Sequence, residues 1–448
     1  MTNGMRIPRR PGTRGRSGAA ALAVAATAVL AVALPAAGQV ASPSTAALGM
    51  ADNFTATARG YSALAWNPAG LALSGGPSTS ALIGTVRALT GLGPVTLADL
   101  ASVQGEVVSD AVRRQWLAEI TAEGGQAGAA GFDMTWAAIQ FGNVGLQFST
   151  TARALNNVSP GLAELLLVGN VDEGTARAID AGGSSVDMSL YSTAAAGYAV
   201  PFQVGPDMLL SIGLSAKYTF GHSMALSGQS TGGTTTDPIT VDLTFPVAYS
   251  PLVGDDGANQ YQTGGGFSFD IGAGLEMGAW TLAATAVNLV STFEWDPDQM
   301  HYREMRLSAS DGEVESSFEQ QAFSAAPASV RQALDDYTFQ RNLALGVLYR
   351  HNPRLMISAD ARHGSTDGLA TRPPMHVGAG LEYRLLPWLP VQAGAAMVRL
   401  RDAREGAQFA GGMRIEVGSF ELSASAGRRE VGGGGETMFM VSLLSHVF

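Results

Sequence analysis

The sequence of 448 residues contains no cysteine. This absence excludes a disulfide scaffold and any metal site built on thiolates. Charged residues are also scarce, at 15%, whereas hydrophobic residues make up 46% of the chain and glycine occurs 56 times. That balance is unusual for soluble domains. Beyond the N-terminal segment, no stretch reaches the roughly 18 to 20 uninterrupted apolar residues of a transmembrane helix. The alternatives are therefore a soluble exported protein and a membrane β-barrel.

The sequence also lacks a convincing motif for catalysis or cofactor binding, so neither an enzyme nor a cofactor is expected. The stretch GQSTG (228–232) fits G-x-S-x-G but lies in a Gly- and Thr-rich loop rather than at a strand-to-helix elbow, which argues against a nucleophilic Ser230. The acidic stretch EWDPDQ (294–299) lacks EF-hand spacing. It fits a solvated loop, bridged to lipopolysaccharide by divalent cations, better than a single-ion site. The histidines show no metal-ligand spacing: His222, His301, His351, His363, His376 and His446.

The N-terminus has the order of a secretory signal, with five arginines followed by AAALAVAATAVLAVALPAAG. We expect cleavage after Gly38, with Ala36 at the minus-three position, so residues 1–38 are predicted to be a signal peptide. The alternative is a retained membrane helix, but the run ends at Pro35 and no charged stop follows it. Cleavage leaves 22 basic and 38 acidic residues, a net charge of −16. A nucleic-acid partner is therefore not expected.

Hydrophobic residues alternate with polar or small ones along most of the chain. In FSFDIGAGLE (267–276), Phe267, Phe269 and Ile271 share one side with Ala273 and Leu275, which predicts a strand with one apolar face. Such segments recur at about 9 to 11 residues, the length of a tilted membrane-spanning strand. Fourteen strands are predicted near 78–87, 132–141, 143–153, 186–200, 208–220, 266–276, 279–290, 342–351, 354–363, 375–385, 389–399, 407–417, 419–428 and 437–448.

The connections decide between a soluble sandwich and a membrane barrel. Turns of a few residues alternate with long loops, as periplasmic turns and external loops do in outer-membrane barrels. The predicted fold is therefore an all-β, transmembrane antiparallel β-barrel of about 14 strands over residues 78–448. A fifteenth candidate, ITVDLTF (239–245), would break the alternation and is assigned to a loop hairpin. Helices are predicted in three long loops, at 109–120, 160–169 and 327–337.

The chain ends in Phe448, with Leu444 and Met440 on the same side of the last strand. This pattern partly matches the terminal aromatic strand that the barrel-assembly machinery uses as a signal, so that machinery is an expected partner.

If the apolar side of each strand faces lipid, the charged residues of the strands must face the lumen, because a charge on the lipid face costs about 2 to 4 kcal/mol at mid-bilayer. A structural ion-pair network between wall and plug is the preferred interpretation, and a charge-selective channel is the alternative. The residues concerned are Asp270, Glu276, Arg350, Asp360, Arg362, Glu382, Arg384, Arg414 and Glu416.

From Ala46, the stretch AALGMADNFTATARGYSALAWNPAGLALS resembles the mature N-terminus of FadL-type long-chain fatty-acid outer-membrane transporters and of related PorV-like barrels. GGGFSFDIGAGLEMGAWTLAATAVNLVS (264–291) is also similar to those barrels, whereas 104–170 looks closer to an uncharacterised branch. The resemblance implies a plug, or hatch, at residues 39–77 inside the barrel. Its core on that basis is Tyr61, Trp66, Asn67, Pro68, Ala69 and Gly70.

The resemblance implies uptake of hydrophobic, fatty-acid-like small molecules across the outer membrane. The apolar loop residues Leu162, Leu165 and Leu166 are predicted to capture the ligand, or alternatively to pack against another loop. The expected surroundings are outer-membrane lipid and lipopolysaccharide. A second hypothesis is a PorV-like barrel that binds proteins in secretion or surface attachment. A third, a barrel enzyme acting on lipids, lacks a credible Ser/His pairing.

Overall fold

The computed structural model describes residues 40–448 except 173–174, 237–239, 251–261, 311–312, 340, 365–368, 370–371, 401–404, 432–433 and 448. The predicted signal peptide and the terminal Phe448 lie outside the described residues. No helix in the described part is both long enough and apolar enough to cross a membrane.

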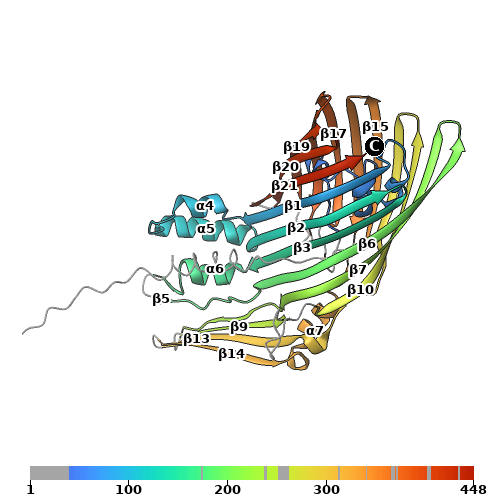
Figure 1. Ribbon diagram of the computed structural model, residues 1–448. Coiled ribbons are helices and arrows are strands. Elements are labelled where there is room, and N and C mark those ends of the chain that lie inside the picture. The colour runs from blue at the N-terminus through green and yellow to red at the C-terminus, as the bar shows by residue number, and fades with distance from the viewer. Residues whose placement is uncertain are drawn as a thin grey trace, which may run out of the picture.

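Fourteen antiparallel strands form a closed β-barrel (Figure 1). The sheet closes because β1 pairs with both β2 and β21. The fourteen predicted strands are all present, which confirms the predicted fold class. They are β1 (Thr79–Gly93), β2 (Gln126–Phe141), β3 (Val144–Val158), β6 (Ser185–Gly205), β7 (Met208–Ser227), β10 (Gly264–Met277), β11 (Trp280–Ser291), β15 (Asn342–Asn352), β16 (Leu355–Gly364), β17 (Met375–Leu386), β18 (Leu389–Arg399), β19 (Glu405–Val417), β20 (Phe420–Val431) and β21 (Gly434–Val447).

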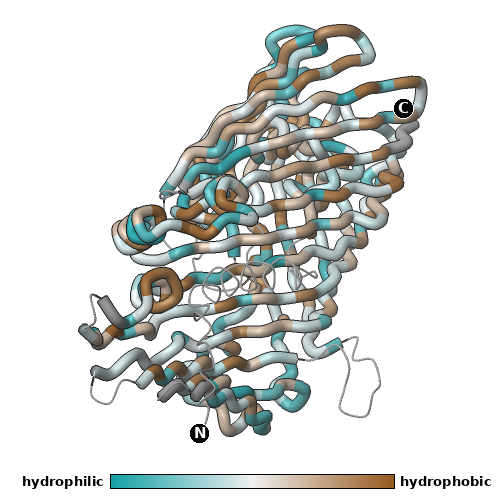
Figure 2. The backbone as a smooth tube through the Cα atoms, turned by 90° about the vertical axis from the view of Figure 1, so that its left-hand side faces the viewer, coloured by the Kyte–Doolittle hydropathy of each residue, from teal (hydrophilic) through white to brown (hydrophobic). Residues whose placement is uncertain are grey.

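The alternation in the sequence becomes the two faces of the wall. In β10, Phe267 is 53% exposed and faces outward, whereas its neighbours Ser268 and Asp270 are buried inside. Apolar positions recur in the same way along the other wall strands (Figure 2). The barrel therefore presents an apolar outer surface and a polar lumen, the arrangement of a membrane-spanning barrel.

Aromatic side chains lie at both edges of the apolar outer surface. Tyr218 of β7 contacts Phe267 of β10, with ring centroids 4.8 Å apart. Near the short turns, Trp280 lies 4.5 Å from Tyr349. Along β10, about 33 Å of strand separates the level of Phe267 from that of Trp280, at 3.3 Å per residue. For strands tilted by about 40°, this corresponds to roughly 25 Å along the membrane normal. This matches the apolar band of a membrane barrel.

Helices of the long loops lie beyond one end of the barrel (Figure 1). They are α4 (Leu97–Ser102) and α5 (Asp110–Ala122) between β1 and β2, and α6 (Pro160–Leu167) between β3 and β6, which is followed by β4 (Val171–Asp172) and β5 (Thr175–Ala176). The serines that precede α5 and α6 cap them, since their side chains accept the N–H of Val112 and Leu162. Trp116 and Ile120 of α5 pack with Ala163 of α6. The helices predicted at 109–120 and 160–169 are confirmed.

Two other long loops build a sheet beyond the barrel, which we call the ledge. It consists of β9 (Thr240–Tyr249), β13 (His301–Ser310) and β14 (Glu313–Ala322), with short β8 (Thr231–Thr234) paired to β9. The end of β7 pairs with β9, so the ledge continues the barrel wall. Residues 240–245 of the predicted stretch belong to β9, which forms the predicted hairpin with β8 and also joins this larger sheet.

The loop that carries β13 and β14 also supplies smaller elements beside the ledge. These are β12 (Glu294–Trp295), η3 (Pro297–Gln299), η4 (Phe323–Ala325) and α7 (Ala328–Asp335). The helix predicted at 327–337 is confirmed by α7.

Candidate functional site

The N-terminal segment from residue 40 to residue 77 lies in the lumen, and we call it the plug. Its elements are α2 (Thr45–Gly49), η1 (Gly60–Ser62), α3 (Ala63–Trp66) and η2 (Pro68–Leu71). α2 packs against β18 to β21, α3 against β3 and β6, and η2 against β6, β7 and β10. Because these strands come from opposite parts of the ring, the plug lies inside the barrel.

The stretch WNPAG separates two short helices of the plug, α3 and η2. Pro68 has no N–H to donate and lies at the first position of η2, where none is required. Asn67 before it is extended, and its side-chain oxygen accepts the N–H of Ala69 at 3.0 Å. The Asn67 amide also donates to the carbonyl of Ala273 in β10, at 3.1 Å. The break in the helix is therefore also an attachment to the wall.

Glycine in the wall lets the plug backbone approach closely. A Cβ atom added at Gly213 of β7 would overlap the backbone of Pro68, and one at Gly394 of β18 would overlap Met50. Within the plug, a Cβ at Gly70 would overlap the carbonyl of Ala58. The barrel and plug therefore fit each other at the level of the backbone.

The structure places each of the predicted plug residues inside the barrel. Trp66 is only 2% exposed and its indole N–H donates to Ser42 Oγ at 3.0 Å. The backbone N–H of Tyr61 donates to Ser80 Oγ of β1 at 2.9 Å. The set is Tyr61, Trp66, Asn67, Pro68, Ala69 and Gly70.

Two lumen carboxylates hold the plug directly. Asp360 Oδ2 in β16 accepts the backbone N–H groups of Phe54 and Thr55, at 3.0 and 2.8 Å. Glu276 in β10 pairs with Arg59 at 2.9 Å and, more distantly, with Arg350 at 3.8 Å. Without the plug, Asp360 would lose both of these donors and Glu276 would keep only the more distant Arg350.

Of the other predicted lumen charges, Arg362 donates to the Asp52 carbonyl of the plug at 3.3 Å, and the rest form ion pairs within the wall. Arg414 lies 3.0 Å from Glu382 and 3.2 Å from Glu416, and Arg384 lies 2.8 Å from Glu416. Asp270 pairs with Lys217 at 2.6 Å. These pairs join wall strands to each other, whereas Glu276, Asp360 and Arg362 contact the plug.

Lys217, Arg59 and Arg372 were missed by reasoning from the sequence. Lys217 is the only lysine of the chain, and this rarity in a predicted strand was the available signal. Its ammonium group also donates to Asn288 Oδ1 at 2.6 Å. Arg59 and Arg372 carried no comparable signal, because their partners lie far away in the sequence.

Trp66 is the centre of a cluster that joins the plug to the wall and to a long loop. The guanidinium carbon of Arg372, in the loop between β16 and β17, lies 3.7 Å from the centroid of the Trp66 ring. That of Arg362 in β16 lies at 5.4 Å, and the Phe54 ring packs edge-on at 5.7 Å. Burial, together with the cation of Arg362, lowers the pKa of Arg372 to about 9, so Arg372 remains protonated at neutral pH.

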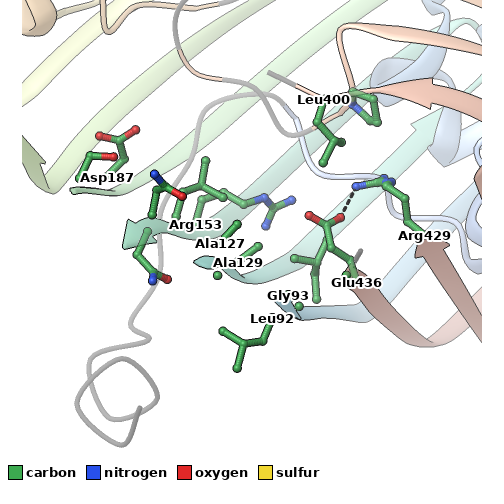
Figure 3. A pocket seen from close by; sticks show the side chains of 18 of the residues that line it. Leu92, Gly93, Ala127, Ala129, Arg153, Asp187, Leu400, Arg429 and Glu436 are labelled. Carbon is green, nitrogen blue, oxygen red and sulfur yellow. Dashed lines mark hydrogen bonds and ion pairs between the residues drawn. The ribbon is translucent and has the colours of Figure 1, made fainter. Parts of the chain in front are cut away.

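A cavity of about 610 Å³ lies at the long-loop end of the lumen. This volume is in the range of small-molecule sites. Figure 3 shows Arg429 and Glu436, 2.5 Å apart, on one side of it, and Arg153 and Asp187 on the other. Leucines and glycines line the cavity together with these polar groups. The lining includes Leu89, Leu92, Arg153, Leu155, Asp187, Tyr337, Leu369, Arg372, Leu400, Arg429 and Glu436.

The predicted capture residues lie away from this cavity. Leu162 is buried and packs with Leu165 against Leu243 of the ledge, as in the alternative of packing between loops. Leu166 is 41% exposed on the outside.

The acidic stretch at 294–299 has a local structural role. Its Asp296 caps η3 by accepting the N–H of Asp298 at 3.0 Å. Within the described part of the chain, no group of three or more His, Cys, Asp or Glu is arranged to hold a metal ion. Ser230 is buried in a loop, where its hydroxyl accepts the N–H of Ser184 at 2.9 Å.

No protein-family model matches the chain, and no curated protein matches it in sequence. Solved structures with a similar fold include a FadL homologue of Pseudomonas aeruginosa, with 13% identity, a TM-score of 0.49, and coverage of 92% of this chain and 100% of that chain. The toluene transporter TodX of Pseudomonas putida has 12% identity and a TM-score of 0.49, over 92% of this chain and 99% of that chain. The toluene transporter TbuX of Ralstonia pickettii has 12% identity and a TM-score of 0.47, over the same shares.

Proposed function

We propose that the protein takes up hydrophobic, fatty-acid-like small molecules across the outer membrane. The observation that carries this proposal is the position of the 610 Å³ cavity, at the long-loop end of a lumen that the plug fills. A solute that enters from the long-loop side meets a site lined by leucines before it meets the plug. Passage then requires the plug to shift, because the plug backbone is in contact with the wall.

An apolar strip outside the barrel mouth supports a first binding step. On the ledge, Phe318 lies opposite Met305, which in turn lies opposite Phe245. Phe318 is 58% exposed, whereas Phe245 packs near Leu165 of α6. The strip therefore runs from α6 across three strands and places apolar side chains above the membrane. We propose that a hydrophobic molecule binds there first and then moves to the cavity.

Uptake into liposomes tests the proposal. Phospholipid vesicles that contain the purified protein should take up a long-chain fatty acid or a monoaromatic hydrocarbon faster than vesicles without protein. No uptake of either probe above empty vesicles would overturn the proposal.

A plug that can be locked provides the matched control. A Cβ atom built at Gly49 of α2 lies 3.0 Å from Cβ of Gln392 in β18. A disulfide requires about 3.5 to 4.5 Å, so G49C/Q392C needs only a small shift. The native chain has no cysteine, so no other thiol competes. The oxidised variant should lose uptake and regain it on reduction. Equal uptake in both states would contradict passage by plug movement.

The protein-binding alternative has its own supporting observation. β14 pairs with β13 on one side, and its residues 315–320 are exposed. An edge strand of this kind can accept an added strand from another protein. Absence of uptake, together with a stoichiometric complex that is lost when β14 is removed, would favour this alternative.

A further inference from the structure

Leu369 and Arg372 lie in the loop between β16 and β17, and the side chain of Arg372 contacts the plug. Arg372 in this loop stacks on Trp66 and donates from Nη2 to the carbonyl of Ala65 at 2.8 Å. Of the side chains that the structure describes, the others that hydrogen-bond to the plug belong to the wall strands or to the plug itself. Among the described residues, Arg372 is therefore the one loop side chain that hydrogen-bonds to the plug.

This contact uses properties that belong to arginine. A planar guanidinium can stack on an indole ring and still donate in its own plane, whereas an ammonium group cannot do both in the same way. Trp66 is only 2% exposed and Arg372 is partly buried against it, which strengthens the attraction between cation and ring. The carbonyl of Ala65 is in α3, so the contact fixes the helix as well as the ring.

The same loop is also tied to the segment between α7 and β15, at the long-loop end of the barrel. Leu369, three residues before Arg372, donates its N–H to the carbonyl of Thr338 at 2.6 Å and forms an isolated bridge with Phe339. Its side chain is buried in an aromatic cluster that includes Phe293 and Trp295. In this loop, Arg372 thus contacts the plug and Leu369 contacts the aromatic cluster at the long-loop end.

We propose that Arg372 is a positioning residue that holds the plug from the long-loop side and makes it move together with the loops over the mouth. The inference rests on the proposed function for its role in transport, but the contact itself can be tested without a ligand. The attachment at Arg372 is distinct from the attachments of Asp360 and Glu276, which lie in the wall strands.

Hydrogen exchange of the purified protein gives the direct test. R372Q should raise the exchange rate of the backbone amides of residues 63–70 by roughly 10- to 100-fold, from the loss of one stacked cation and one charged hydrogen bond. R372K keeps the charge but not the planar stack and should lie between R372Q and the native protein. R399Q is the matched control, because Arg399 is at the same end of the barrel and pairs with Glu405 rather than with the plug.

A double-mutant cycle with W66L separates this contact from a general loss of structure. If Arg372 acts through Trp66, R372Q should add little to the exchange already caused by W66L. Unchanged exchange in R372Q, or fully additive effects in the cycle, would overturn the inference. Should R372Q fail to migrate as a folded barrel on unheated gels, R372K and the cycle built on it decide the question.

Liposome uptake by the same variants keeps the two proposals distinguishable. Faster exchange in R372Q without uptake by the native protein would contradict the proposed function and leave the role of Arg372 intact. Uptake by the native protein with unchanged exchange in R372Q would contradict the role of Arg372 and leave the proposed function intact. If both hold, R372Q should also raise the open probability of single channels in planar bilayers.

Discussion

The Glu276 carboxylate holds the short-turn end of the plug, so E276Q should loosen the plug there. The carboxylate lies 2.9 Å from the Arg59 guanidinium and accepts the Ser74 N–H at 2.9 Å. Glutamine keeps an oxygen for Ser74 but loses the charge opposite Arg59. A hydrogen bond to a charged group contributes about 1.5 to 3 kcal/mol, and both side chains are at most 10% exposed. A loss of about 2 kcal/mol raises the population of the displaced plug roughly 30-fold.

Single-channel recording in planar bilayers measures this population as the fraction of time in a conducting state. E382Q is the matched control, since Glu382 pairs with Arg414 at 3.0 Å within the wall and is similarly buried. E276Q should increase the open fraction by about the factor above, and E382Q should leave it unchanged. An open fraction for E276Q equal to that of the native protein, or an equal increase in E382Q, would refute the assignment of Glu276 to plug closure.

Two further substitutions test the wall and the ledge. K217M leaves Asp270 as a buried charge without its ion-pair partner, which should destabilise the barrel by about 3 to 5 kcal/mol and lower the temperature at which folded mobility on gels is lost. K217M/D270L should restore part of that loss, and a single variant as stable as the native barrel would contradict a stabilising role for the pair. F318S should slow liposome uptake at low ligand concentration while leaving the saturated rate unchanged, because it removes only the first binding step. An unchanged rate at every concentration would argue against capture on the ledge.

The wall strands could be predicted from the sequence because the membrane imposes a rule on every second residue. This rule no longer applies beyond the outer edge of the apolar band, and the predicted strand ends are wrong there. β1 continues to Gly93 and β7 to Ser227, beyond the predicted ends at 87 and 220. β13 and β14 were missed for the same reason, since HYREMRLSAS and EVESSFEQQA contain too few apolar residues to show the alternation.

The plug contacts show a different limit. The break between the two short helices at WNPAG is a local effect, because Pro68 lies at the first position of η2. Which wall residues receive the break depends on pairs far apart in the chain, such as Arg59 with Glu276 or Trp66 with Arg372. Charge alternation showed that Glu276 must face the lumen. It contained no information on which guanidinium would meet it there, because register between plug and wall is fixed only in the assembled barrel.

The glycines at positions 213 and 394 also determine what an empty lumen would look like. Each leaves a notch in the wall that the plug backbone occupies. When the plug withdraws, these two notches remain open, because neither glycine has a side chain to fill the vacated space. The wall therefore keeps the shape that fits the plug backbone at Gly213 and Gly394. At these two positions, the plug backbone can therefore return without any rearrangement of the wall.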